Sequence, residues 1–214
     1  MSYRILIVDD HPLLRRGLGQ LLALEPGRGL ELAGEAGSGS EGLRLAESLD
    51  PDLILLDLEM PGMSGVETLK ALREAGYTTP VVVLTVSDRD EDVAETLRAG
   101  ASGYLLKDME PERLIDSLSR AVEGEVVISP ALTATLARAM NADSDSDSVG
   151  IEALTARERE ILGRLARGQS NKMIARELDI TEGTAKVHVR NLLRKMKLRS
   201  RVEAAVWAVQ HGIG

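Results

Sequence analysis

Short aliphatic runs alternate with amphipathic segments along the first part of the chain. The expected strands cover residues 4–8, 30–34, 52–57, 81–85 and 103–106. Between the first two, Leu14, Leu18 and Leu21 recur at helical spacing, and Val66 and Leu69 do so after the third. A fivefold alternation of strand and helix predicts an α/β fold built on a doubly wound parallel sheet of five strands.

From residue 151 onward the pattern is helical throughout. Thr155 with Glu158 three residues later forms a capping-box signature at the start of one helix. A second helix is expected over 171–178, a turn at Asp179-Ile180, and a third helix over 182–197 capped by Thr181. A final helix is expected over 201–210. The pattern predicts a small all-α domain that contains a helix-turn-helix.

Residues 141–150 consist mainly of aspartate and serine and have almost nothing to bury, so they are interpreted as a flexible linker. Residues 129–140 are helical in pattern and would form a tether before it. We therefore expect one domain over 1–125, a linker with a short helix over 126–150, and a second domain over 151–214.

Charge is distributed unevenly between the two expected domains. The chain has a net charge of −8, but residues 1–150 carry −14 and residues 151–214 carry +6. A basic second domain indicates a polyanionic partner.

The absence of cysteine excludes disulfides, thiol catalysis and Cys-based zinc sites, and it favours a reducing cytoplasm. No apolar run approaches the roughly 20 residues of a membrane helix, and the first strand leaves no room for a signal peptide. We expect a soluble cytoplasmic protein.

Three aspartates follow two of the expected strands. Asp9 and Asp10 follow the first, and Asp57 ends the third. Neighbouring parallel strands would bring these carboxylates together at the carboxyl edge of the sheet, where open α/β folds bind ligands. Clustered anions need a cation, and Mg²⁺ is the hard oxygen-seeking ion that fits. Taken alone, Asp10 could instead cap the helix that Pro12 starts, and Asp57 could be a turn residue.

Two more polar residues are expected at the same edge. Thr85 ends the fourth strand and Lys107 follows the fifth, so a hydroxyl and an ammonium can meet a phosphoryl group on Asp57. A carboxylate beside Mg²⁺ can attack phosphorus and form an acyl phosphate. Each residue also has an ordinary structural interpretation, and only the combination favours a phosphoryl site.

Residues 37–42 match the dinucleotide motif G-x-G-x-x-G, but they follow the second strand rather than the first. We interpret them as a flexible loop in which Ser40 caps the next helix.

The third helix of the second domain has two distinct stripes. Ala185, Val189, Leu192 and Met196 form an apolar stripe, and Lys186, Arg190, Arg194 and Lys197 form a basic one. For an isolated helix a solvated cationic face would be the better interpretation. The preceding short helix and tight turn favour a recognition helix in a DNA major groove. The chain has no phenylalanine, which disfavours RNA readers that stack bases on aromatic side chains.

The first domain resembles the receiver domain of two-component response regulators. The resemblance rests on the Asp9-Asp10 pair and on Asp57 followed by Met60-Pro61-Gly62. It rests also on the positions of Thr85, Tyr104 and Lys107, the last of which is followed by Asp108. It implies a flavodoxin-like fold in which Asp57 accepts phosphate from a sensor histidine kinase. It also implies that Asp9, Asp10, Asp57 and the backbone carbonyl of Glu59 hold Mg²⁺, and that Thr85 and Tyr104 form a switch pair.

The second domain resembles the LuxR-type helix-turn-helix of the NarL/FixJ family. Residues 154–158, Asn171-Lys172-Met173-Ile174-Ala175 and Lys186-Val187-His188-Val189 carry the likeness. It implies that Lys186, Val187 and Arg190 approach base edges and that Lys172, Thr184 and Arg194 lie near phosphates. It also implies dimerisation through Val202, Ala205, Val206 and Val209. Arg190 replaces an expected lysine and Ala185 an expected valine, so base preference could differ.

Together the resemblances imply a transcription factor rather than an enzyme, similar to nitrate- and nitrite-responsive members of the family. The implied partners are a sensor kinase in the membrane, promoter DNA bound as a homodimer, and RNA polymerase. One hypothesis is that the unphosphorylated receiver covers the recognition helix. Two alternatives stay open. One is a regulator that ignores phosphorylation; the other is an aspartyl-phosphate hydrolase, although Glu59 departs from the D-x-D-x-T pattern of that class.

Overall fold

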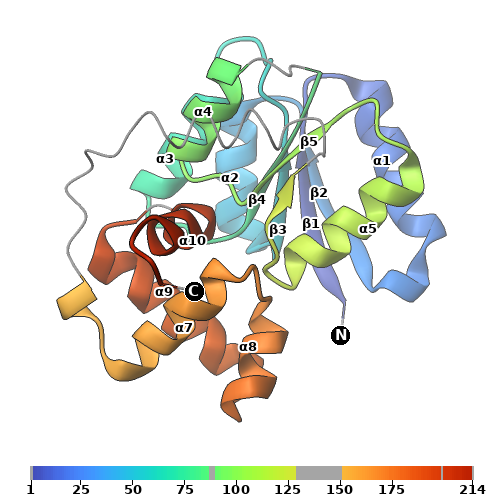
Figure 1. Ribbon diagram of the computed structural model, residues 1–214. Coiled ribbons are helices and arrows are strands. Elements are labelled where there is room, and N and C mark those ends of the chain that lie inside the picture. The colour runs from blue at the N-terminus through green and yellow to red at the C-terminus, as the bar shows by residue number, and fades with distance from the viewer. Residues whose placement is uncertain (1, 87–89, 129–150, 199, 214) are drawn as a thin grey trace.

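The computed structural model describes residues 2–86, 90–128, 151–198 and 200–213 (Figure 1). The first domain is a parallel sheet in the order β2-β1-β3-β4-β5-β6. Its strands are β1 (Tyr3–Val8), β2 (Leu30–Ala36), β3 (Leu53–Leu56), β4 (Val81–Thr85), β5 (Gly103–Leu106) and β6 (Val127–Ile128). The predicted five-stranded doubly wound sheet is confirmed, and the two-residue β6 extends it. The expected tether over 129–140 and linker over 141–150 lie outside the described residues.

Helices cover both faces of the sheet. Helices α1 (Pro12–Leu24) and α5 (Pro111–Val122) lie on one face; α2 (Gly39–Leu49), α3 (Gly65–Glu74) and α4 (Asp90–Arg98) lie on the other (Figure 1). A short 3₁₀ helix, η1 (Pro26–Arg28), precedes β2. Alternate strand residues serve the two cores: Ile5 and Ile7 pack toward α1 and α5, and Leu6 and Val8 toward α2 and α3. Because both faces are buried, the central strands are continuous aliphatic runs.

The strand order reverses between β1 and β3. The chain passes from β1 outward to β2 and then returns to place β3 on the other side of β1. Such a switch point opens a crevice beyond the carboxyl ends of the two strands. The residues that follow β1 and β3 therefore face each other across this crevice.

The predicted cap of α2 is wrong, and the alternative interpretation of Asp10 as a cap is not met. Ser38, not Ser40, caps α2, because its hydroxyl accepts the backbone N–H of Glu41 at 3.3 Å. Asp10 does not cap α1: His11 is the cap residue and no side chain caps that helix. The pattern of residue types places a cap only to within two residues when several small polar residues are adjacent.

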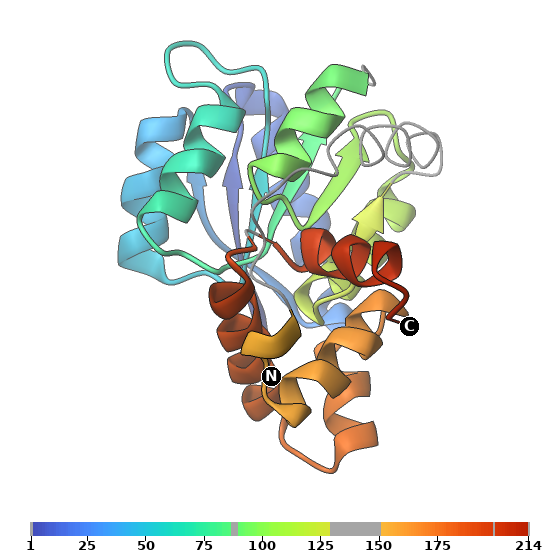
Figure 2. The same ribbon diagram turned by 60° about the vertical axis from the view of Figure 1, so that its left-hand side comes forward.

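The second domain has a 3₁₀ turn, η3 (Ile151–Ala153), and helices α7 (Ala156–Ala166), α8 (Asn171–Leu178), α9 (Glu182–Met196) and α10 (Arg201–Gln210) (Figure 2). The Thr155 capping box and the Thr181 cap are confirmed. The chain turns between α8 and α9 at Asp179, which adopts a left-handed conformation. The predicted apolar stripe of α9 lies in the core with Ile161 and Leu165. None of the helices within the described residues combines the length and apolarity that a membrane crossing requires.

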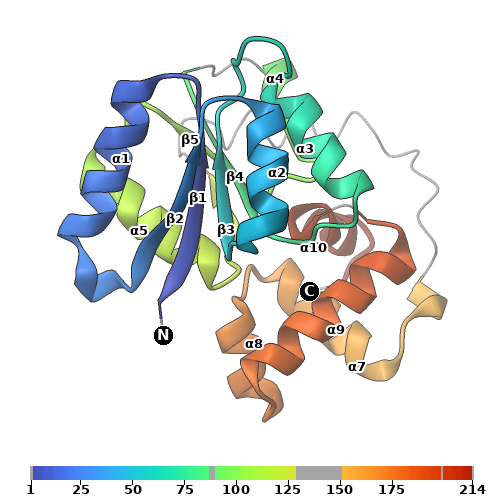
Figure 3. The same ribbon diagram turned by 180° about the vertical axis from the view of Figure 1, so that it is seen from behind.

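The second domain packs against the end of the sheet at which the strands begin (Figure 3). Lys186 of α9 lies 5.8 Å from the ring centre of Tyr3, the first residue of β1. Val202 of α10 is buried in the same hydrophobic cluster as Leu97 of α4 and Tyr104 of β5. The chain thus joins its two domains at the edge opposite the β1–β3 crevice.

Gly103 provides a test of the packing between β5 and β6. A Cβ atom there would lie 2.5 Å from Cγ2 and 2.6 Å from the carbonyl oxygen of Val127. We expect Gly103→Ala to lower the stability of the first domain by about 2 kcal/mol because the core is overpacked. Gly17→Ala is the matched control: its Cβ would meet nothing within 4 Å, and loss of a helical glycine should stabilise by about 0.5 kcal/mol. Calorimetric melting would measure both, and equal melting temperatures for the two variants would contradict the account.

Candidate functional site at the carboxyl edge

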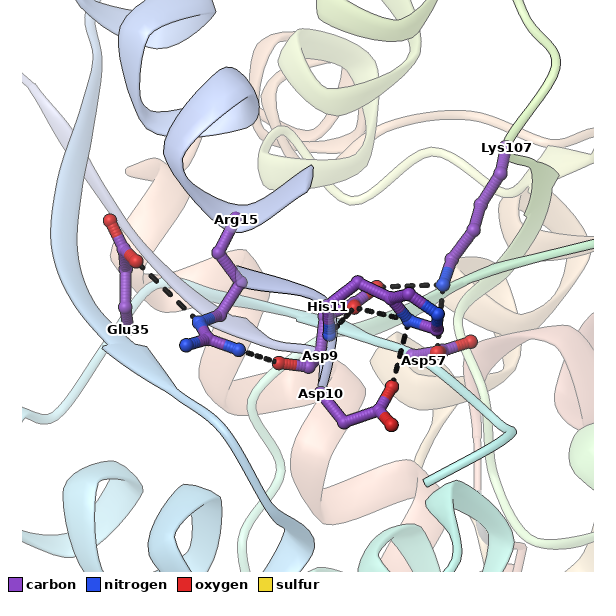
Figure 4. Close-up of polar contacts among 7 residues, drawn as sticks. All are labelled: Asp9, Asp10, His11, Arg15, Glu35, Asp57 and Lys107. Carbon is purple, nitrogen blue, oxygen red and sulfur yellow. Dashed lines mark hydrogen bonds and ion pairs between the residues drawn. The ribbon is translucent and has the colours of Figure 1, made fainter. Parts of the chain in front are cut away.

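Three carboxylates and one imidazole meet in the crevice. Asp9 follows β1 and Asp57 follows β3, and their side chains are only 4% and 2% exposed. One ligand atom each from Asp9, Asp10, His11 and Asp57 lies within 4.8 Å of the others (Figure 4). The structure therefore brings together the three acids that the sequence singled out, and it adds His11. The oxygens of the three carboxylates fit a hard divalent cation.

Lys107 is the cation that this structure places among the acids. Its ammonium lies 2.7 Å from Oδ2 of Asp57 and 2.8 Å from Oδ2 of Asp9 (Figure 4). The end of β5 holds it in place, since the Lys107 backbone N–H donates to the carbonyl of Thr85 at 2.8 Å. An ammonium in this position can transfer its hydrogen bonds to a new anionic group without crossing the site.

Burial raises the pKa of Asp57, and the charge of Asp9 adds to that rise. Hydrogen bonds from Lys107 and from the backbone N–H of Glu59 oppose it. For Lys107 burial lowers the pKa, but the hydrogen bonds to Asp57 and Asp9 outweigh it, so the net pKa is raised. The site thus holds a carboxylate that is costly to ionise beside an ammonium that keeps its proton.

His11 and Arg15 organise the turn after β1. The His11 backbone N–H donates to Oδ1 of Asp9 at 2.7 Å, and its Nδ1 lies 2.8 Å from Oδ1 of Asp10. Arg15 of α1 donates to the backbone carbonyl of Asp9 and lies 3.6 Å from the carboxylate of Glu35 (Figure 4). The sequence interpretation missed both Arg15 and Glu35. Arg15 lies one helical turn after His11, the residue that precedes α1, and this spacing is the signal that could have indicated Arg15.

Three further predicted residues differ in burial. Thr85 ends β4 and is fully buried; Tyr104 of β5 is also fully buried. Glu59 follows Asp57 by two residues and is exposed. Tyr104 lies in the hydrophobic cluster that also contains Val202 of α10. The tyrosine therefore shares a hydrophobic cluster with one residue of the second domain, whose own core is separate.

The residues expected to contact DNA lie on the surface of α8 and α9. Lys172, Thr184, Lys186, Val187, Arg190 and Arg194 are all exposed. Lys186 pairs with Glu182 at 3.2 Å in addition to facing Tyr3, and Lys172 lies 3.1 Å from Glu123 of the first domain. Of the residues expected at a dimer interface, Val209 is 63% exposed, Ala205 is half-buried and Val202 is buried against the first domain. The side chain of Val206 lies outside the described atoms.

Comparisons with known proteins agree with this organisation. The family model of the response regulator receiver domain matches residues 5–119, and that of the bacterial regulatory proteins of the luxR family matches residues 152–208. The nitrate/nitrite response regulator protein NarL of Escherichia coli K12 is 55% identical over 209 residues, which cover 98% of this chain and 96% of NarL. The nitrate/nitrite response regulator protein NarP of the same strain is 48% identical, with 97% and 95% covered.

Solved structures include a full-length match. The crystal structure of the response regulator ChrA of a heme-sensing two-component system has a TM-score of 0.52 and 33% identity, and the match covers 100% of this chain and 99% of ChrA. The relatives are transcription regulators rather than enzymes, which removes the hydrolase alternative. The chain belongs to the two-component response regulators of the NarL/FixJ family, which join a receiver domain to a LuxR-type DNA-binding domain.

Proposed function

We propose that this response regulator is controlled by nitrate or nitrite and that Asp57 is its phosphoacceptor. The names of the NarL and NarP relatives, which match nearly the whole chain, support the signal. The observation that carries the phosphoacceptor is the pair of contacts that Lys107 makes with Asp57 and Asp9 at the switch point of the sheet. A sensor histidine kinase, in the membrane if the signal arrives from outside, would be the donor.

The residues at the carboxyl edge of the sheet would have different roles in phosphoryl transfer. A carboxylate oxygen of Asp57 forms the new bond to phosphorus, and the bond from phosphorus to the donor nitrogen breaks. Lys107 then binds a phosphoryl oxygen, and the Thr85 hydroxyl and Tyr104 respond to the new group as the switch pair. Asp9, Asp10, Asp57 and the carbonyl of Glu59 would hold Mg²⁺, which when bound neutralises charge on the incoming phosphoryl oxygens.

The DNA-binding domain supplies the output. Lys186, Val187 and Arg190 on α9 would enter the major groove, while Lys172, Thr184 and Arg194 would contact phosphates. Dimerisation through α10, with Val202, Ala205, Val206 and Val209, would set two recognition helices on paired half-sites. We place the domain limits at 1–125, 126–150 and 151–214. The protein would act in the cytoplasm, where it can reach promoter DNA and RNA polymerase.

Contacts between the domains support an occluded state before phosphorylation. Lys186 faces Tyr3 and Lys172 pairs with Glu123, so two residues proposed to contact DNA are engaged by the receiver. Val202 of the proposed dimer surface is buried against the receiver as well. Phosphorylation of Asp57 would release these surfaces. The alternative, a regulator that ignores phosphorylation and keeps its DNA-binding half exposed, does not expect these contacts.

Lys107 gives the first test of the charge balance. Lys107→Met should lower receiver stability by about 2 kcal/mol at pH 8 without metal, because buried carboxylates lose their cation. Without Lys107 the pKa of Asp57 rises further, so the folded state binds the proton more tightly than the unfolded state does. The stability of the variant therefore falls as pH rises through that pKa. The difference in stability between Lys107→Met and wild type should be smaller near pH 4.5 than at pH 8.

Lys70→Met is the matched control for Lys107→Met. Lys70 makes an exposed ion pair with Glu95 at 2.8 Å, so its loss should cost under about 0.5 kcal/mol at either pH. Calorimetric melting in a chelator measures both variants. An equal loss for Lys107→Met at pH 8 and pH 4.5 would show that its cost is not electrostatic.

Phosphorylation itself is tested by intact-mass spectrometry after incubation with acetyl phosphate and Mg²⁺. The wild type should gain one phosphoryl group, Asp57→Asn should gain none, and the exposed control Asp50→Asn should behave as wild type. Phosphorylation should also tighten binding to promoters of nitrate-controlled genes by roughly tenfold or more. A phosphoryl adduct on Asp57→Asn would move the phosphoacceptor elsewhere.

A further inference from the structure

We propose that Glu123-Gly124-Glu125, here called the α5 turn, is the docking point that holds the DNA-binding domain on the receiver. In this proposal the carboxylate of Glu123 pairs with the ammonium of Lys172, which would otherwise bind a DNA phosphate. Gly124 is the positioning residue that lets the two domains approach each other. The proposal rests on the proposed function and deepens it, because it names the residues through which the closed state excludes DNA.

The first contact is made by the backbone. The N–H of Asn171 donates to the carbonyl of Glu123 at 3.0 Å. Asn171 is the first residue of α8, so its N–H has no acceptor within its own helix. Glu123 follows the last residue of α5, where carbonyls likewise lack partners. One hydrogen bond between the domains therefore satisfies two helix ends.

The second contact is an ion pair beside the first. The ammonium of Lys172 lies 3.1 Å from Oε1 of Glu123, and this hydrogen bond raises the pKa of Lys172. The side chain of Lys172 is 67% exposed, so a phosphate could reach it. A carboxylate and a phosphate compete for the same ammonium, so binding of the α5 turn and of the DNA backbone at Lys172 exclude each other.

The third contact is a close approach that only glycine allows. Gly124 has φ +89°, and a Cβ atom there would lie 2.7 Å from Nη1 of Arg201 and 2.7 Å from Nδ2 of Asn171. Neither neighbour can easily move, because the buried guanidinium of Arg201 donates to Oδ1 of Asn171 at 2.9 Å and to the carbonyl of Gln169. Any side chain at position 124 would push α8 and α10 away from the receiver.

The α5 turn is also connected to the phosphoryl site. Helix α5 begins at Pro111, four residues after Lys107, and runs to the opposite edge of the sheet, where it ends beside α8 (Figure 1). A shift of Lys107 toward a phosphoryl group on Asp57 therefore acts at the start of the helix whose far end carries the docking contacts.

Gly124→Ala in the full chain is the direct test, with Gly76→Ala as its matched control. Gly76 stands at the same position after α3, with φ +84°, but a Cβ there would meet nothing within 4 Å. Both variants carry the same backbone strain, and only one has a side chain in the domain interface. Asp57 phosphorylation, measured by mass, checks that the receiver of each variant is folded.

Without phosphate, Gly124→Ala should bind promoter DNA about tenfold more tightly than wild type, which corresponds to about 1.4 kcal/mol, and Gly76→Ala should match wild type. After phosphorylation all three should bind equally. The amide of Asn171 should exchange with solvent faster in Gly124→Ala. Unchanged unphosphorylated affinity, or an equal loss of affinity in both states, would overturn the proposal. If phosphorylation did not change wild-type affinity, the proposed function would fail separately.

Glu123→Gln tests the ion pair, with Asp116→Asn as its control. Asp116 lies on the same helix and pairs with Arg28 at 2.7 Å, so both variants remove one negative charge from α5. Glu123→Gln should tighten DNA binding by the unphosphorylated chain several-fold at low salt, and the gain should fade at high salt. An equal gain from Asp116→Asn would assign the effect to net charge and reject the competition at Lys172.

Discussion

The central constraint on this structure is the repulsion among three carboxylates that lie together at one edge of the sheet. Asp9 and Asp57 are almost completely buried, and their oxygens share one ammonium, that of Lys107. Desolvation makes such a cluster unfavourable when charged, so the site is stabilised by any added cation. In the switch that we propose, a phosphoryl group on Asp57 and a bound metal would change this balance of charge.

The site and the output domain lie at opposite edges of one sheet. The acids follow the ends of β1 and β3, while Tyr3 at the start of β1 faces Lys186 of the recognition helix. In this arrangement a phosphoryl group on Asp57 would therefore not contact the DNA-binding domain directly. Two features within the described residues extend from the sheet toward the second domain. They are α5, which Glu123 follows, and the buried cluster that contains both Tyr104 and Val202. Helix α5 begins four residues after Lys107, and Tyr104 lies three residues before that lysine. Their other ends contact surfaces that we propose for DNA binding and dimerisation.

The sequence was sufficient for features that depend on local pattern. Aliphatic runs located five strands, and the convergence of Asp9, Asp10 and Asp57 followed from the topology of parallel sheets. The apolar stripe of α9 was also found correctly because a helical period needs no knowledge of the neighbours. Receiver and LuxR-type resemblance then supplied the roles.

Features that depend on distant partners could not be predicted. Arg15 contacts the Asp9 turn only because α1 packs beside β2, and β6 is too short to show a period. The cap of α2 was misplaced by two residues because Ser38 and Ser40 are equivalent in pattern. The role of Gly124 depends on Arg201 and Asn171 of another domain, which no local pattern in α5 encodes.

The central claim, that charge at Asp57 separates the domains, is tested most directly by a distance between them. The chain has no cysteine, so spin labels can be placed at Glu31→Cys and Arg176→Cys, two exposed sites in different domains. Pulsed electron spin resonance should give one narrow distance distribution without phosphate. With acetyl phosphate and Mg²⁺ the distribution should become longer and broader, and the same labels on Asp57→Asn should not respond. A distribution that stays narrow and unmoved while mass spectrometry shows Asp57 fully phosphorylated would contradict the account.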